Sequence, residues 1–121
     1  MKYENLKFDV QDNIGRITLN RPNSANAITI PLVKELLDVA IRCESGEKLR
    51  VLILQGEGPI FCAGGDLKDM EERLKVNPTG GSGISAASAR RIIYNLLDFE
   101  KPLIGAINGH AIGLGATLGL L

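Results

Sequence analysis

Two segments of the chain have residue types and spacing suited to holding a negatively charged oxygen. They read FCAGGDL at 61–67 and GHAIGLG at 109–115. In each, strand-forming residues lead into a glycine-containing turn and then into a helical pattern. The first turn of a helix presents backbone N–H groups that lack intrahelical partners, at the positive end of the helix dipole. Because glycine also lets a ligand approach the main chain closely, the two turns could direct two N–H donors at one oxygen.

Two such donors are the requirement for stabilising an oxyanion that develops during a reaction. Removing one donor from a site of this kind typically lowers the rate about 100- to 1,000-fold. A purely structural interpretation stays open for either turn alone, with Asp66 as a helix N-cap and Gly64 and Gly65 as turn residues. The occurrence of both turns, in this order and at this separation, favours an oxyanion-binding site over the purely structural interpretation.

The first half of the chain predicts a hairpin followed by a helix. Residues 6–12 and 14–20 alternate between apolar and polar side chains, and residues 13–15 join them, which is typical of two antiparallel strands. After Thr29, a possible N-cap, Pro31 suits a first helical turn. Apolar residues then recur with helical spacing at Leu32, Val33, Leu36, Leu37, Ala40 and Ile41.

The second half predicts two buried strands and further helices. The apolar runs at 51–55 and 103–107 are typical of strands covered on both faces. Residues 76–85, rich in Gly, Ser and Pro, indicate a loop, and residues 86–98 form an amphipathic pattern. The apolar stripe of that pattern consists of Ala89, Ile92, Ile93, Leu96 and Leu97. This alternation of strands and helices predicts a mainly parallel α/β layer.

The composition excludes several classes of protein. The chain has 121 residues, 45% of them hydrophobic, with 14 basic and 14 acidic side chains that cancel. This balance argues against nucleic-acid binding, and no apolar run is long enough for a membrane span. Residues 1–10 lack the apolar run of a signal peptide. Cys43 and Cys62 lack metal-ligand spacing and indicate reduced thiols. We therefore expect a soluble, cytoplasmic protein without a bound metal.

Three segments together resemble successive motifs of the crotonase superfamily of enoyl-CoA hydratases and isomerases. They are NRPNSANAI at 20–28, FCAGGDL at 61–67 and INGHAIGLGA at 107–116, and the similarity covers nearly the whole chain. The resemblance implies an α/β, crotonase-like (ClpP/crotonase) β-β-α spiral fold. Members are typically about twice this length, and residues 111–121 form an apolar segment without a polar end. We therefore expect a truncated fold in which 1–121 is the N-terminal part of an acyl-CoA-binding domain.

The resemblance also implies roles for individual residues. The backbone N–H groups of Gly65 and Leu114 would form the oxyanion hole, and Asp66 would cap the following helix. The substrate would be an acyl-CoA thioester that reacts through an enolate, so coenzyme A is part of the substrate and no separate cofactor is expected. Homotrimers or hexamers are the implied assembly. The residues expected to line the coenzyme A site are Ala25, Asn26, Ala27, Ile28, Ala63, Gly64, Gly65, Asp66, Leu67 and Gly113.

Two positions depart from the family pattern. Position 114, usually glycine, is leucine, which keeps the backbone donor while changing the side chain near the acyl group. Thr117 stands where hydratases of the family carry the first of two glutamates. Threonine cannot take up or release a proton near neutral pH, so it cannot act as that general acid or base. Members that shift a double bond with a single carboxylate resemble this chain better, and that carboxylate would lie beyond Leu121.

The sequence thus favours an isomerase-like acyl-CoA enzyme, although decarboxylases and hydrolases share the fold. A non-catalytic acyl-CoA-binding or scaffold protein of the same fold stays open as an alternative. Glycines at 113, 115 and 119 also resemble a dinucleotide-binding turn, but the acidic residue that such a turn requires is missing. His110 is expected to pack or form a hydrogen bond at its turn, and Cys62 is expected to be buried rather than catalytic.

Overall fold

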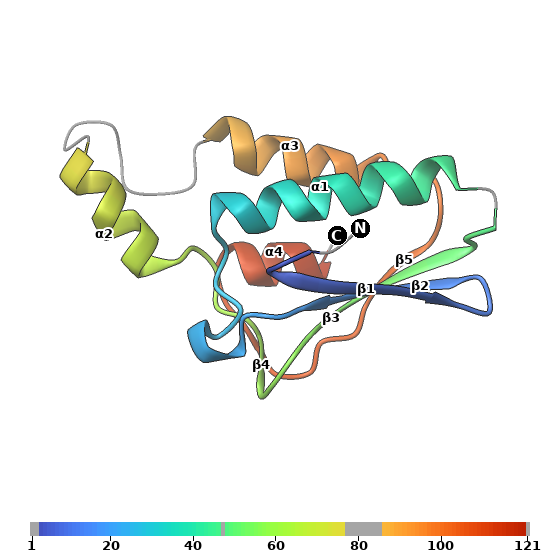
Figure 1. Cartoon of the computed structure of the whole chain (residues 1–121), viewed down its shortest axis with the longest axis horizontal. Coiled ribbons are helices and arrows are strands. Elements are labelled where there is room, and N and C mark those ends of the chain that lie inside the picture. The colour runs from blue at the N-terminus through green and yellow to red at the C-terminus, as the bar shows by residue number, and fades with distance from the viewer. Residues whose placement is uncertain (1–2, 47, 77–85, 121) are drawn as a thin grey trace.

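The computed structural model describes residues 3–46, 48–76 and 86–120, which form two sheets and the helices around them (Figure 1). The larger sheet has the strand order β1-β2-β3-β5, comprising Leu6–Gln11, Ile14–Leu19, Val51–Gly56 and Leu103–Gly105. The smaller sheet pairs β4 (Ile60–Cys62) with β6 (His110–Ala111). The helices are α1 (Ile30–Ser45), α2 (Leu67–Val76), α3 (Ala86–Leu97) and α4 (Leu114–Leu120), with a short 3-10 helix, η1, at Pro22–Ser24.

The sheet is mainly parallel, as predicted. Among the described strands of this sheet, β1 and β2 run antiparallel, while β3 lies parallel to both β2 and β5. The hairpin loop is Asp12–Asn13 rather than residues 13–15, and both of its residues have positive φ, which is typical of a two-residue hairpin turn. Gly15 lies inside β2 instead, where an added Cβ would come within 2.6 Å of the Leu49 side chain.

Helix α1 supplies a larger share of the buried hydrophobic residues than any other described element. Its N-cap is Thr29, whose hydroxyl accepts a hydrogen bond from Leu32 N–H at 3.4 Å, and Pro31 occupies the first turn, as predicted. The buried side chains of α1 are Leu32, Val33, Leu36, Leu37, Val39, Ala40 and Cys43. Ile41 is exposed, contrary to expectation. Figure 1 shows α1 and α3 side by side above the same face of the sheet.

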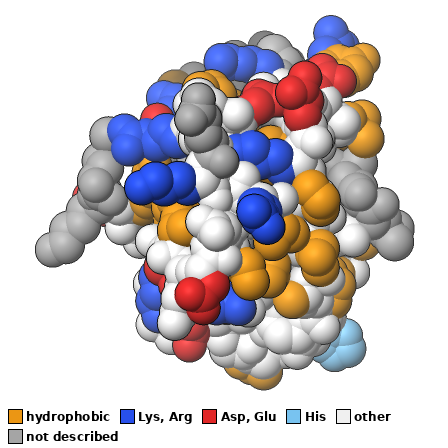
Figure 2. All heavy atoms as spheres, turned by 90° about the vertical axis from the view of Figure 1, so that its right-hand side faces the viewer, with side chains coloured by type: hydrophobic (Ala, Val, Ile, Leu, Met, Phe, Trp, Pro, Cys, Tyr) orange, Lys and Arg blue, Asp and Glu red, His pale blue; other side chains and the backbone are white. Residues whose placement is uncertain are grey.

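The C-terminal part is less covered than the sequence suggests. Residues 103–107 do not form a strand buried on both faces, because Ile104 is 51% and Ile107 46% exposed. The physical reason is that β5 is the edge of the sheet: it pairs with β3, and no described strand lies beyond it. On α3, Ile92 and Leu96 are buried as predicted, whereas Leu97 is exposed. Figure 2 shows one face on which hydrophobic side chains gather beside lysines and arginines.

Two further expectations concern the remaining segments. The predicted loop at 76–85 lies largely outside the described residues, and Val76 ends α2. Residues 111–119 are only partly buried, with Leu118 in the core and Ile112 exposed. Within the described ranges, every helix is too short or too polar to cross a bilayer.

We predict that the 121-residue chain self-associates through the exposed apolar side chains near β5, because burying such surface against a second molecule removes it from water. Ile104→Lys should reduce the association measured by sedimentation velocity. Ile41→Lys on α1 is a matched control, since Ile41 is similarly exposed on another element. A wild-type chain that sediments as a single monomer at high concentration would contradict the prediction.

Candidate active site

The two glycine-rich turns lie against each other because the strands that precede them are paired. β4 and β6 run parallel, with Ile60 opposite His110 and Cys62 opposite Ala111. Just beyond this pairing, Ile112 N–H donates a hydrogen bond to the Cys62 carbonyl at 3.0 Å. Since parallel strands end at the same edge, the turn at 63–66 and the turn at 112–114 become neighbours.

Glycine is required where the two turns touch. Gly64 has a φ of +88°, and a Cβ built on it would lie 2.7 Å from the Ile112 carbonyl oxygen. The same Cβ position is 3.6 Å from the Leu114 nitrogen, which places that donor beside the first turn. A Cβ on Gly115 would collide with the Cys62 carbonyl, and one on Gly109 with the Pro59 carbonyl. Backbone thus packs directly on backbone at three points.

The direction of each candidate donor is set by the carbonyl of the same peptide group. Gly64 C=O accepts a hydrogen bond from Ile28 N–H at 2.6 Å. In a trans peptide the C=O and the next N–H point in opposite directions, so Gly65 N–H points away from Ile28. Gly113 C=O likewise accepts from Thr117 N–H at 3.1 Å, which directs Leu114 N–H away from α4. Neither donor has a hydrogen-bond partner within the described residues.

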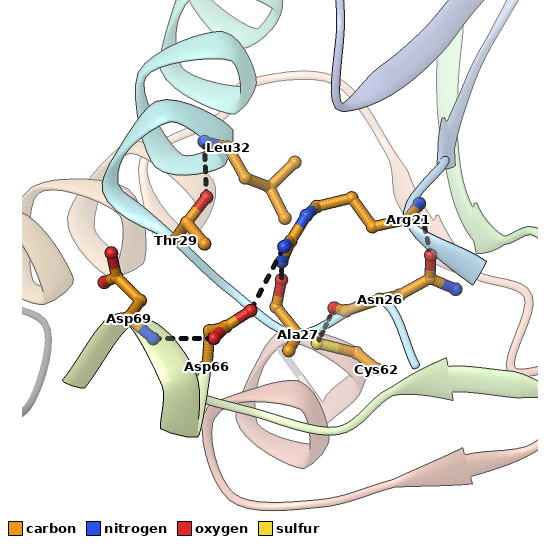
Figure 3. A network of polar contacts seen from close by, with 8 residues as sticks. All are labelled: Arg21, Asn26, Ala27, Thr29, Leu32, Cys62, Asp66 and Asp69. Atoms are coloured by element: carbon orange, nitrogen blue, oxygen red, sulfur yellow. Dashed lines mark hydrogen bonds and ion pairs between the residues drawn. The ribbon is translucent and has the colours of Figure 1, made fainter. Parts of the chain in front are cut away.

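Asp66 caps α2 and is paired with an arginine. Asp69 N–H donates to Asp66 Oδ1 at 2.9 Å, which confirms the expected capping role. Arg21 donates from Nη2 to Asp66 Oδ2 at 3.1 Å and from Nη1 to the Ala27 carbonyl (Figure 3). The hydrogen bond from Asp69 N–H, followed by the contacts with Arg21, lowers the pKa of Asp66 although burial opposes this effect. The carboxylate is therefore held in its charged form.

Asn26 holds the preceding segment in an unusual conformation. Ala25 and Asn26 both have left-handed φ angles, 54° and 53°. The fully buried Asn26 amide accepts from Arg21 N–H at 2.8 Å and donates to the carbonyls of Glu57 and Ile60, each at 2.9 Å. One side chain thereby closes the turn at 21–26 and joins it to the stretch at 57–60.

Asn108 connects the second glycine-rich segment to the loop between β3 and β4. Its Oδ1 accepts from Gly56 N–H at 3.0 Å, and its Nδ2 donates to the Gly58 carbonyl at 2.7 Å. Asn108 thus aligns the chain that leads into β6. The sequence motif contained this residue, but its spacing alone did not reveal the loop it would bind.

Cys62 and His110 are not placed to act as catalytic groups. Cys62 is fully buried, as predicted, and its Sγ donates to the Asn26 carbonyl at 3.2 Å. Burial raises the pKa of the Cys62 thiol, and a hydrogen bond from Gly64 N–H only partly offsets this rise. The uncharged thiol is a poor nucleophile. His110 is exposed at the start of β6, so it does not pack in the turn as expected.

An open pocket of about 600 Å³ lies beside the first turn. It includes five of the residues expected to contact coenzyme A, namely Ala27, Ala63, Gly65, Asp66 and Leu67. Asn26, Ile28 and Gly64 are buried behind it, while Gly113 is exposed on the second turn. Thr117 is also exposed, and its hydroxyl donates to the Gly113 carbonyl at 3.4 Å. Arg21, Ser24 and Thr29 line the pocket without having been predicted.

Comparison with known proteins relates the chain to one family. Residues 9–121 match the family model described as enoyl-CoA hydratase/isomerase. The chain is 36% identical over 115 residues to 1,2-epoxyphenylacetyl-CoA isomerase of Escherichia coli K12, covering 92% of this chain and 42% of that protein. It is 32% identical over 115 residues to 4-chlorobenzoyl coenzyme A dehalogenase-2 of an Arthrobacter species, covering 95% of this chain and 42% of that one.

Solved structures show the same relationship. The crystal structure of enoyl-CoA hydratase from Bacillus anthracis superposes with a TM-score of 0.83 at 31% sequence identity. The superposition covers 97% of this chain and 45% of the hydratase. The chain therefore has the α/β fold of these proteins and spans somewhat less than half of the length of the relatives it matches.

We predict that Asn26→Ala destabilises the fold by about 3 kcal/mol or more, because it leaves one donor and two acceptors without partners at about 1–3 kcal/mol each. Asn13→Ala is the matched control, since Asn13 also has positive φ but lies in the exposed hairpin loop. That control should lose only about 1 kcal/mol. Urea denaturation measures both, and equal losses would show that the Asn26 hydrogen bonds contribute nothing.

We predict that Asp66→Asn removes a stabilisation that depends on pH. Asparagine keeps the capping oxygen but loses the charge that pairs with Arg21, at a cost of about 2 kcal/mol near pH 7. Because the pKa of Asp66 is lowered in the folded state, its contribution is fully present above the unfolded pKa of about 3.9. The contribution is lost as the pH falls through the lower folded pKa. Urea denaturation between neutral and acid pH should show the two proteins converging.

The control for this experiment is Glu57→Gln, which breaks the exposed pair of Glu57 with Lys7. It should change the free energy of unfolding by less than about 1 kcal/mol at every pH. A difference between wild type and Asp66→Asn that stays constant down to acid pH would rule out a charge effect.

Proposed function

The chain belongs to the enoyl-CoA hydratase/isomerase family, and we propose that its two glycine-rich turns bind the thioester carbonyl of an acyl-CoA. The carbonyl oxygen accepts hydrogen bonds from Gly65 N–H and Leu114 N–H. When the thioester becomes an enolate, the negative charge develops on this oxygen, and donors that are already in place stabilise it.

The observation that carries this proposal is the packing of the two turns. Gly64 lies against residues 112–114, and each adjacent candidate donor is without a partner in the described structure. Backbone N–H groups turned away from their own hydrogen-bonded carbonyls are available to a ligand. Two such donors at helix starts, on turns that touch each other, suit the binding of one ligand oxygen.

Coenzyme A would lie along the open pocket beside the first turn. Backbone groups of residues 25–28 and 63–67, together with Gly113, would contact it. Support comes from the pocket lining, which includes Ala27, Ala63 and Gly65. The substrate would supply the coenzyme A, so the protein would need no separate cofactor.

Among thioester reactions, an isomerase-like proton shift is the one we favour. Thr117 occupies the position of a hydratase glutamate and cannot act as a general base near neutral pH. Its hydroxyl donates to the Gly113 carbonyl instead. The two curated relatives described above are named as an isomerase and a dehalogenase, each with a coenzyme A thioester in its name. Neither name describes the hydration of a double bond, the reaction that would need the missing glutamate.

The alternative is a non-catalytic acyl-CoA-binding or scaffold protein on the same fold, which the threonine also favours. An isomerase would need a carboxylate that moves the proton, whereas this alternative would not. Assembly into trimers or hexamers and a cytoplasmic location belong to the same proposal.

The experiment compares Leu114→Pro with Leu114→Ala in the complete gene product. Leu114 is the first residue of α4, where proline fits a helix and removes the N–H, whereas alanine keeps it. We predict that Leu114→Pro lowers kcat for 3-enoyl-CoA isomerisation about 100- to 1,000-fold. Leu114→Ala should retain most of the wild-type kcat. Circular dichroism checks that both variants are folded.

The outcomes separate the proposed reaction from its alternative. Isomerisation of 3-enoyl-CoA that is lost only in the proline variant supports the oxyanion hole and the isomerase assignment. Hydration of 2-enoyl-CoA at a comparable rate would overturn the role given to Thr117. Binding of acyl-CoA by the wild type without any turnover would favour the non-catalytic protein.

A further inference from the structure

We infer that Arg21 is a positioning residue for the Gly65 donor, acting through Asp66 and the Ala27 carbonyl. This inference rests on the proposed function, because it concerns how the first half of the oxyanion hole is held. Arg21 comes from the segment that follows β2, whereas Gly65 belongs to the turn after β4. The arginine would therefore fix the relative position of two parts of the chain that lie 45 residues apart.

The guanidinium bridges these two parts directly. One nitrogen, Nη2, donates to Asp66 Oδ2 at 3.1 Å, and the other, Nη1, donates to the Ala27 carbonyl. A guanidinium is planar and presents its donors in a fixed geometry, so two simultaneous contacts define an orientation as well as a distance. Figure 3 shows Arg21 reaching across to Asp66 and Ala27 from the opposite side of the network.

The bridge connects the same two segments, 25–28 and 63–66, whose hydrogen bonds hold Gly65. Ile28 N–H donates to the Gly64 carbonyl at 2.6 Å, and Asp66 N–H donates to the Ile28 carbonyl at 3.1 Å. These hydrogen bonds flank Gly65 on both sides and join residues 25–28 to residues 63–66. Since glycine has no side chain of its own to anchor it, the orientation of Gly65 N–H depends on how firmly these two segments are held together.

The environment makes this ion pair stronger than an ordinary surface pair. The side chains of Arg21 and Asp66 are 20% and 11% exposed, against 59% and 47% for Lys7 and Glu57. Water screens the exposed pair, but the more buried pair is screened much less. Removing Arg21 would also leave the Asp66 carboxylate partly buried with only backbone donors to stabilise it.

Arg21 also lines the pocket, so two other roles must be separated from positioning. A direct contact with substrate would change KM, whereas a purely structural role would change only the melting temperature. A shift of a donor by about 1 Å can cost about 100-fold in rate. Positioning therefore predicts a lower kcat with little change in KM for the fraction of protein that is folded.

The experiment measures kcat, KM and melting temperature for Arg21→Met, Asp66→Asn and the double variant in the complete gene product. Lys7→Gln is the matched control, because it also breaks an ion pair but lies outside the proposed site. We expect kcat to fall about 10- to 100-fold in Arg21→Met, with KM within about 3-fold of wild type. Asp66→Asn should behave similarly, and the double variant should be no slower than Arg21→Met because both break one bridge.

Several results would overturn the inference. A higher KM with unchanged kcat would make Arg21 a substrate contact, and a lower melting temperature with unchanged kcat and KM would make it structural only. Multiplicative losses in the double variant would show that Arg21 does not act through Asp66. Loss of kcat in Lys7→Gln to the same extent would show that the effect is not specific to the bridge.

A second measurement keeps this inference separate from the proposed function. If Arg21 joins the two segments, Arg21→Met should speed amide hydrogen exchange at Ile28 and Asp66 while leaving Ile17 in β2 unchanged. Turnover that Leu114→Pro abolishes, with no effect of Arg21→Met, would overturn the inference and leave the proposed function standing. If no thioester is turned over, the proposed function fails, and unchanged exchange at Ile28 and Asp66 would overturn the positioning role as well.

Discussion

The buried amide of Asn26 is the constraint on which the arrangement of the candidate site depends. Left-handed backbone is unfavourable for residues other than glycine, and here two consecutive residues, Ala25 and Asn26, adopt it. The conformation persists because the amide satisfies a donor and two acceptors from separate segments. With the chain turned in this way, residues 25–28 run beside the first glycine-rich turn, and Ala25 and Ile28 form hydrogen bonds with it.

The directions of the two candidate N–H donors are set by backbone hydrogen bonds. Ile28 N–H donates a hydrogen bond to the Gly64 carbonyl and so fixes the peptide group between Gly64 and Gly65. The candidate donor, Gly65 N–H, lies on the opposite edge of that peptide group. The second turn repeats the arrangement with Gly113 and Thr117. Side chains contribute mainly by holding backbone in place, as Asp66 does for α2 and Asn108 for the loop after β3. A site built in this way can tolerate leucine at position 114 because its side chain is not the donor.

The sequence predicted those features that depend on local pattern. The helix after Thr29, the parallel α/β layer and the burial of Cys62 all follow from spacing and residue type, and the three motifs indicated the family. Arg21 and Asn26 were not recognised as the residues that join the motifs, because their distant partners lie 31 to 45 residues away and spacing does not reveal such contacts. The available signal for this ion pair was an arginine, Arg21, directly after a predicted strand, together with an acidic N-cap, Asp66, elsewhere in the chain. The predicted burial of residues 103–107 was wrong, since apolar composition does not show whether a strand lies at an edge.

The close packing of the two glycine-rich turns also has a consequence for the order in which the protein folds. The hairpin of β1 and β2 and the helix α1 involve residues near one another in the chain and can form early. The contacts between Gly64 and residues 112–114, like those of Asn108 with residues 56 and 58, close loops of about 50 residues. Closing long loops is slow because chain entropy must be lost before any contact forms. During synthesis, the candidate donors can therefore meet only after the last glycine-rich segment has left the ribosome, so the site is the final part of this region to become ordered.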